Sequence, residues 1–169
     1  IYAWQELLDR TPTHRPALDA LERLFRQTEQ WEQVQDVLEK KVGVSDSPSE
    51  KVTLLCERAS IVLDDLSDPD GAITILNRAL ELEPGDDKAL TLLEKVYVTR
   101  VEWEQVISVL ERRDEHAPTD ALRAAAKVRM AEVYEEHLNE PELAVEAFEQ
   151  ALELVPGDVA TADRLARLY

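Results

Sequence analysis

The sequence predicts an all-α fold in which antiparallel helix pairs stack in a row. Apolar residues recur at three- and four-residue spacing along the whole chain, which is the period of an α-helix. The chain also aligns with itself when it is shifted by 72 positions. Glycine is scarce, at 4 of 169 residues, and no alternating pattern predicts a strand. Because two short helices cannot bury their apolar stripes alone, successive pairs are expected to pack on one another.

The self-alignment is carried by short identical segments. Trp31-Glu32-Gln33-Val34 returns as Trp103-Glu104-Gln105-Val106, and Ala79-Leu80-Glu81-Leu82 returns as Ala151-Leu152-Glu153-Leu154. The matches fall mainly on apolar positions and turn residues, which are the positions that fix how a repeat packs. One packing unit is therefore expected to be used more than once.

Apolar positions and stop signals divide the first half of the chain into helices. Leu18, Leu21 and Phe25 share one face of a helix because of their spacing. Asp68 before Pro69 indicates a helix start, since aspartate caps the first turn and proline is tolerated there. The helices expected here span residues 1–10, 15–28, 31–42, 49–65 and 69–82.

The second half repeats this plan. Pro84-Gly85-Asp86 ends one helix and offers an aspartate cap to the next, and Pro156-Gly157-Asp158 does the same. Asn139 is expected to cap the helix that begins near Pro141. The helices expected here span residues 86–98, 102–115, 119–137, 141–154 and 158–169, which makes ten in all.

Charge and composition exclude several classes of function. The chain has 19 Lys and Arg against 36 Asp and Glu, a net charge of −17. This balance argues against nucleic-acid binding, which needs positive charge, and against docking on anionic membranes. No apolar stretch is long enough for a transmembrane helix. Cys56 is the single cysteine, so no internal disulfide is possible, and a cytoplasmic location is expected.

The repeat resembles the tetratricopeptide repeat (TPR) family. The resemblance rests on small residues in the first helix and on an Ala, aromatic or Leu, Ala and Pro pattern in the second. The residues that carry it are Ala59, Ala72, Leu76, Ala79 and Pro84, then Ala131, Tyr134, Ala144, Phe148, Ala151 and Pro156. It implies a right-handed superhelical solenoid of helix pairs.

Two features depart from the family pattern. Glu22 and Glu94 stand where the family usually has a small residue. Trp31 and Trp103 are not the usual family tryptophan, because each opens a second helix, and core packing is their expected role. The result is expected to be a divergent super-repeat of two units.

The whole chain, 1–169, is expected to form a single repeat array. Its ends align with the middle of a unit, so we expect a fragment of a longer array. The units are a half unit at 1–14, full units at 15–52, 53–86, 87–124 and 125–158, and a half unit at 159–169.

No residue pattern indicates catalysis or a cofactor. His14, His116 and His137 are too scattered to form a metal site and are interpreted as solvated surface residues. Cys56 lies among apolar neighbours, which favours a buried and unreactive thiol. No Gly-rich phosphate loop or Ser/His/Asp signature is present. We therefore expect no enzyme activity, no catalytic or metal-binding residues and no cofactor.

The resemblance implies a protein-interaction module that binds a peptide or helical segment in a concave groove lined by first helices. Arg23, Lys95 and Arg167 recur at one groove position and predict a basic ladder suited to a carboxylate-bearing peptide. The groove residues that the resemblance implies are Asp19, Arg23, Arg26, Arg58, Lys88, Thr91, Lys95, Arg129, Asp163 and Arg167.

Three alternatives stay open at the level of sequence. The basic residues could only pair with nearby glutamates and keep the protein soluble. A basic partner could dock on the acidic surface, with strong salt dependence. The array could also be a structural spacer, or associate end to end through apolar faces near Trp4 and Tyr169. In each case the expected partner is a protein, with no nucleic acid and no membrane insertion.

Overall fold

The computed structural model describes residues 1–169 and is helical throughout, so the all-α prediction is confirmed. The helices are α1 (Tyr2–Arg10), α2 (Arg15–Gln27), α3 (Trp31–Val44), α4 (Pro48–Asp64), α5 (Pro69–Leu82), α6 (Asp87–Thr99), α7 (Trp103–His116), α8 (Asp120–Val133), α9 (Pro141–Leu154) and α10 (Val159–Leu168). The expected helix over 119–137 is α8 continued by a π-helical segment, η1 (Tyr134–Leu138). The other helices begin and end within two residues of the expected bounds.

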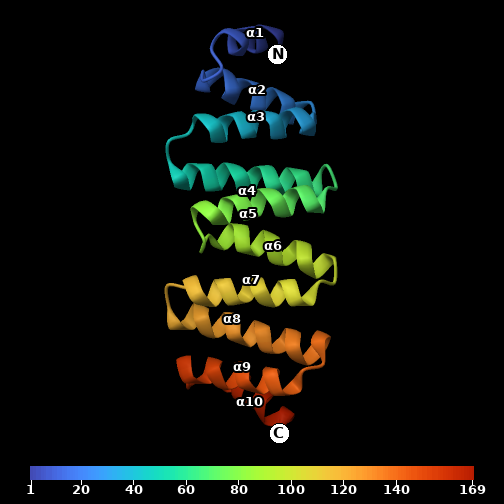
Figure 1. The fold of residues 1–169 in the computed structure, drawn as a ribbon, viewed down its shortest axis with the longest axis vertical. Helices are drawn as coiled ribbons and strands as arrows, with labels where there is room; N and C mark the ends of the chain where they lie inside the picture. The colour runs from blue at the N-terminus through green and yellow to red at the C-terminus, as the bar shows by residue number, and fades with distance from the viewer. The chain divides into compact units, whose positions relative to one another are not determined.

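The helices pack in sequential order within two compact units, Ile1–Leu92 and Leu93–Tyr169 (Figure 1). In the first unit each of the helices α1 to α4 contacts the helix that follows it. In the second unit α7 contacts α8, α8 contacts α9, and α9 contacts α10. Helix α6 contains the junction of the two units. Packing between neighbours in sequence is the arrangement that a helical repeat requires.

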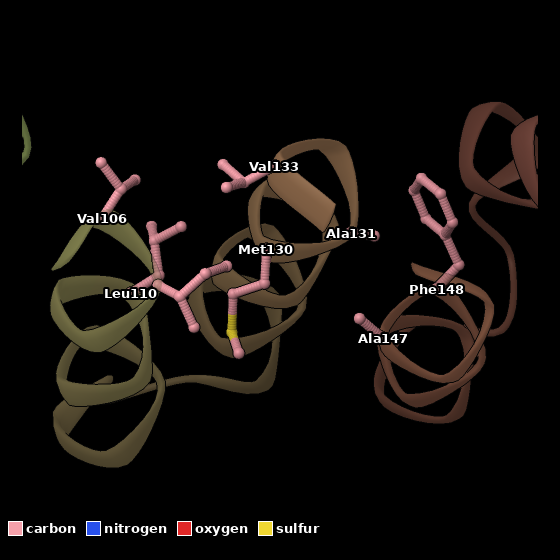
Figure 2. Close-up of a cluster of buried hydrophobic side chains, with 8 residues drawn as sticks. Val106, Leu110, Met130, Ala131, Val133, Ala147 and Phe148 are labelled. Carbon is pink, nitrogen blue, oxygen red and sulfur yellow. The ribbon is translucent and has the colours of Figure 1, made fainter. Parts of the chain in front are cut away.

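The core consists of the residues that carry the helical period. In the first unit Leu18, Leu38 and Leu76 have no exposed surface. In the second unit Leu110 of α7 lies close to Met130 of α8, and Phe148 of α9 belongs to the same cluster on the other side of α8 (Figure 2). Each helix of a pair therefore hides its apolar stripe against its neighbours, which is the main favourable term in folding.

Side-chain caps set most helix starts. The Asp68 carboxylate accepts a hydrogen bond from the Gly71 N–H at 2.9 Å, as expected, and Asp158 caps α10. The expected cap at Asn139 is wrong. Asn139 ends η1 in the left-handed conformation, with φ 55°, and α9 begins after Glu140 without a side-chain cap. Asparagine adopts this conformation readily, because its short polar side chain bonds locally.

The 72-residue period is visible in the backbone of the turns inside the helix pairs. Four non-glycine residues have positive φ: Glu29 at 53°, Ser67 at 55°, Val101 at 60° and Asn139 at 55°. Glu29 and Val101 are 72 positions apart, and so are Ser67 and Asn139. The turn at Glu29 therefore has the same backbone conformation as the turn at Val101, and the turn at Ser67 the same as the turn at Asn139.

These turns differ in length by one residue. In the first type, the N–H of Gln30 donates to the carbonyl of Phe25 at 2.9 Å, five residues back. In the second type, the N–H of Asp68 donates to the carbonyl of Val62 at 2.9 Å, six residues back. The corresponding bonds recur 72 residues later. The repeat units 53–86 and 125–158 therefore have a turn one residue longer than that of the units 15–52 and 87–124.

The unusual glutamates in the first helices form ion pairs with the second helices. Lys41 of α3 donates to Glu22 at 2.9 Å, and both side chains are about 15% exposed. The Arg113 guanidinium lies 3.0 Å from Glu94 in the second unit. In the unit between them, the first-helix residue at this position is the small Ala59 of α4, which is 1% exposed. A charged and a small residue thus alternate at this position from one repeat unit to the next, in keeping with the 72-residue period.

Candidate functional site

First helices of the first unit border an open hollow of about 560 Å³. Such a volume lies within the usual range for ligand sites, roughly 300–1,000 Å³. The lining residues are Glu22 and Arg26 of α2, Trp31 of α3, Glu57, Ser60, Ile61 and Asp64 of α4, Asp65 after α4, and Lys88 of α6. Side chains that are far apart in sequence are thus brought to one surface, which we name the α2–α4–α6 hollow.

The α2–α4–α6 hollow is acidic overall. Four carboxylates line it, those of Glu22, Glu57, Asp64 and Asp65, against the two cations of Arg26 and Lys88. The lining side chains thus carry two more negative than positive formal charges, although Lys41, which is outside the lining, also pairs with Glu22. A hollow of this kind favours positive groups, because low-dielectric walls focus the field of its charges.

Arg26 is held within the protein. Its guanidinium lies 2.9 Å from Glu22 and 3.5 Å from Glu57, so it links α2 to α4. The arginine therefore lies in the hollow, as the groove hypothesis expects, but its charge is already balanced by two carboxylates.

Asp19 is also engaged by the scaffold. The Lys41 amine lies 2.7 Å from Asp19 as well as 2.9 Å from Glu22. Burial lowers the pKa of Lys41, but the hydrogen bonds to both carboxylates outweigh it, and the pKa is raised. Asp19 also lines a smaller surface depression of α2, together with Arg23 and Gln27.

Arg58 does not line the α2–α4–α6 hollow. It reaches from α4 to α3, where its guanidinium lies 2.6 Å from Glu39 and 3.4 Å from the side-chain oxygen of Gln35. Glu39 also accepts from Arg78 of α5 at 2.9 Å. The bond from Arg78 is the main cause that lowers the pKa of Glu39; burial opposes it, and the charges of both arginines add to it. Arg58 is therefore part of a three-helix ion-pair network.

The second unit has its own hollow, of about 500 Å³, which is lined mostly by small and apolar side chains. Arg129 lies in it and pairs with Glu94 at 3.3 Å and Glu132 at 3.1 Å. The other lining residues are Ala121, Ala124, Ala125, Val128, Val155 and Asp158. Here too the expected basic group is balanced by carboxylates of the same unit.

The remaining expected binding residues are all exposed. Arg23 and Lys88 make no ion pair. Thr91 and Lys95 lie on α6, and Asp163 and Arg167 lie on α10. Arg23 belongs to the first compact unit, whereas Lys95 and Arg167 belong to the second. The basic ladder stays a prediction.

Sequence reasoning missed several residues of the hollow. Trp31 was assigned to core packing, yet it is only half-buried and lines the hollow with Ile61 and Asp65. The available signal was its position, since the first residue of a helix lies at the edge of the packed stripe. Asp65 gave no signal, because one exposed aspartate among 36 acidic residues is not distinctive.

Cys56 is buried, as its apolar neighbours predicted. Burial, reinforced by the carboxylate of Asp86 at 3.6 Å from the sulfur, raises the pKa of the thiol to about 12. The thiol is therefore protonated and a poor nucleophile at neutral pH.

Comparison with known proteins places the fold among TPR proteins. Residues 17–52 match the tetratricopeptide repeat family. The fold is similar to that of a MamA protein, at TM-score 0.55 and 19% identity over 90% of this chain and 79% of that one. It is also similar to a MamA structure from Desulfovibrio magneticus RS-1, at TM-score 0.53 and 20% identity over 89% and 81%. No curated protein sequence is significantly similar.

A third similar structure is YrrB, described as a TPR protein with an unusual peptide-binding site. Its TM-score is 0.55, with 17% identity over 95% of this chain and 79% of that one. The chain is thus an all-α protein with a TPR-like fold of helices packed in sequential pairs, and the resemblance seen in the sequence is confirmed.

TPR proteins generally mediate protein–protein or peptide binding. None of the helices is both long and apolar enough to span a bilayer.

Proposed function

We propose that the protein is a non-catalytic interaction module that binds a peptide or helical segment of a partner protein on the α2–α4–α6 hollow. The observation that carries this proposal is that first helices of three successive pairs border one open hollow. A segment laid there contacts several repeats at once, which is how helical repeat proteins form extended binding surfaces.

The charges of the hollow do not favour a binding site built on a row of basic side chains. Arg26 is balanced by Glu22 and Glu57, and Arg58 is turned toward α3, so fewer free cations face a ligand than the sequence implies. The proposal therefore rests on the shape and mixed chemistry of the hollow rather than on a basic ladder.

A blocking substitution tests the site. Ser60 lines the hollow, and its hydroxyl donates to the carbonyl four residues back, at 3.1 Å. Ser60→Tyr fills the hollow and is expected to abolish binding of peptides selected from a random library on the wild-type protein. Thr74→Tyr is the matched control, because Thr74 of α5 makes the same kind of bond, at 3.0 Å, and is exposed.

Circular dichroism and thermal unfolding establish that both variants fold. Equal loss of binding in both folded variants, or no loss in either, would contradict the proposed site.

The acidic surface supports a second candidate, docking of a basic partner. Exposed glutamates of α9 belong to a chain with a net charge of −17; they are Glu142, Glu146, Glu149 and Glu153. Such a field speeds association with a basic partner and is screened by salt. Binding of this kind would survive Ser60→Tyr and disappear at about 0.5 M salt, where the Debye length is short.

A further inference from the structure

The two matching tryptophans have different surroundings. In the second unit Trp103, the first residue of α7, is covered by the imidazole of His137 from η1. The ring centroids are 3.6 Å apart and the planes differ by 1°, so the two rings stack face to face. This copy of the repeat therefore shows that a planar side chain fits over the tryptophan.

In the first unit no ring stacks on the matching tryptophan, Trp31. The residues 72 positions earlier are Trp31, the first residue of α3, and Asp65, directly after α4. No ring or guanidinium stacks on Trp31, and the Asp65 carboxylate makes no ion pair. Both residues line the α2–α4–α6 hollow. A half-buried indole on which no ring or guanidinium stacks and a carboxylate without an ion pair thus line the same hollow, with Asp65 at the repeat position of His137.

We infer that the α2–α4–α6 hollow binds an arginine side chain of the partner protein, with the guanidinium stacked on Trp31 and paired with Asp65. This inference rests on the proposed function and names the chemistry that the site recognises. A guanidinium is planar and weakly hydrated, stacks on aromatic faces, and donates two parallel hydrogen bonds to a carboxylate. It is the one protein side chain that meets both demands with a permanent charge.

Charge complementarity supports this occupant over an acidic one. Carboxylates outnumber cations by four to two among the side chains that line the hollow, and Arg26 competes little because Glu22 and Glu57 already pair with it. Lys88 is the only other cation that lines the hollow, and it is exposed. Removal of Lys88 should therefore strengthen arginine binding, whereas it should weaken the binding of a carboxylate.

The test uses a small probe, so that no partner needs to be known. N-acetyl-arginine methylamide is titrated into the 169-residue protein while the three indole N–H signals are followed by NMR. A saturable shift of the Trp31 signal is expected, larger than with the lysine or citrulline analogue. Trp103 is the internal control, because His137 already covers it. Trp31→Phe assigns the signal.

Exchanging the two copies tests the inference most directly. Asp65→His copies the second unit and is expected to cover Trp31 and remove its response. His137→Asp copies the first unit and is expected to make Trp103 responsive. Both exchanges are checked by circular dichroism, and unchanged responses in folded variants would overturn the inference.

Variants that change a single charge measure how much each charged residue contributes to the affinity for the arginine probe. Asp65→Asn is expected to weaken the probe by about two- to fivefold, the range for an exposed ion pair. Lys88→Ala is expected to strengthen it. Asp46→Asn is the matched control, since Asp46 is exposed in the turn after α3, outside the hollow, and the charge change is the same.

The result also separates this inference from the proposed function. An arginine probe that fails to shift Trp31, or shifts all three tryptophans equally, overturns the inference. If library peptides without arginine still bind and are blocked by Ser60→Tyr, the proposed function stands and only its arginine chemistry is wrong. If neither a library peptide nor the arginine probe binds the wild-type protein, both are wrong.

Discussion

Val101 occupies the turn between α6 and α7 with φ at 60°, in the left-handed region. A β-branched residue is disfavoured there, because its Cβ crowds the backbone. The N–H of the next residue, Glu102, donates to the carbonyl of Tyr97 at 2.9 Å, so the closing bond of the turn fixes this conformation. Replacing Val101 by asparagine, which tolerates left-handed backbone, should therefore stabilise the protein.

The expected gain follows from exposure and strain. The left-handed conformation costs an ordinary L-residue roughly 1–2 kcal/mol. Val101 is 66% exposed, so little buried apolar surface is lost when it is replaced. Val101→Asn should raise the free energy of unfolding by about 1 kcal/mol, which corresponds to roughly 2–4 °C in Tm for a chain of this length. Val101→Gly should gain less, because glycine gives the unfolded chain more freedom.

Urea denaturation followed by circular dichroism measures this change. Val159→Asn is the matched control, since Val159 is 71% exposed but lies in a right-handed helix. The control should stay within about 0.5 kcal/mol of the wild type. The strain argument fails if Val101→Asn and Val101→Gly both leave the unfolding midpoint where it was, or if the control gains as much as they do.

Three other predictions follow from the ion pairs and the thiol. Lys41→Met leaves two carboxylates of α2 without their common cation and should destabilise by about 1–3 kcal/mol in urea, whereas the same change at exposed Lys40 should have little effect. Glu39, whose pKa is lowered chiefly by the hydrogen bond from Arg78, contributes stability above its ordinary pKa of 4.5 and loses it as the pH falls through the folded value. The stability difference between wild type and Glu39→Gln should therefore shrink from pH 7 to about pH 3, and a constant difference would contradict this assignment. Cys56, buried and with its pKa raised to about 12, should react with a thiol reagent at neutral pH only after denaturation; rapid labelling of the native protein would show that the thiol is accessible.

Helix positions were predictable because local signals agree with the packing. These signals each involve residues that are close in sequence, so a single sequence reveals them. They are the three- and four-residue period, the aspartate before Pro69 and the Pro-Gly-Asp segments that end helices. The structure of the segment over 119–137 was harder to predict. Its helical pattern continues through Tyr134–Leu138, which the structure forms as a π-helical segment. The same longer turn follows α4 without such a segment, so neither the pattern nor the turn alone predicts it.

The residues that line the α2–α4–α6 hollow, the proposed binding surface, were only partly predictable from the sequence. The resemblance placed Arg26 and Lys88 near a groove, and both line the α2–α4–α6 hollow. It also placed Arg58 there, which instead pairs with Glu39 on α3. The partner of a long arginine side chain depends on how neighbouring helices pack. Arg58 of α4 therefore contacts Glu39 and Gln35 of α3, which its position in the sequence does not reveal.

The amino-acid order by itself established the helices, their pairing and the 72-residue period, because these depend on spacing along one chain. It also established the excess of negative charge. Only the tertiary structure decided which charges are balanced internally and which face solvent, since an ion pair depends on distances between helices far apart in sequence. For the same reason Trp31 and Trp103, which each begin the segment Trp-Glu-Gln-Val, differ in whether a ring of the chain stacks on them.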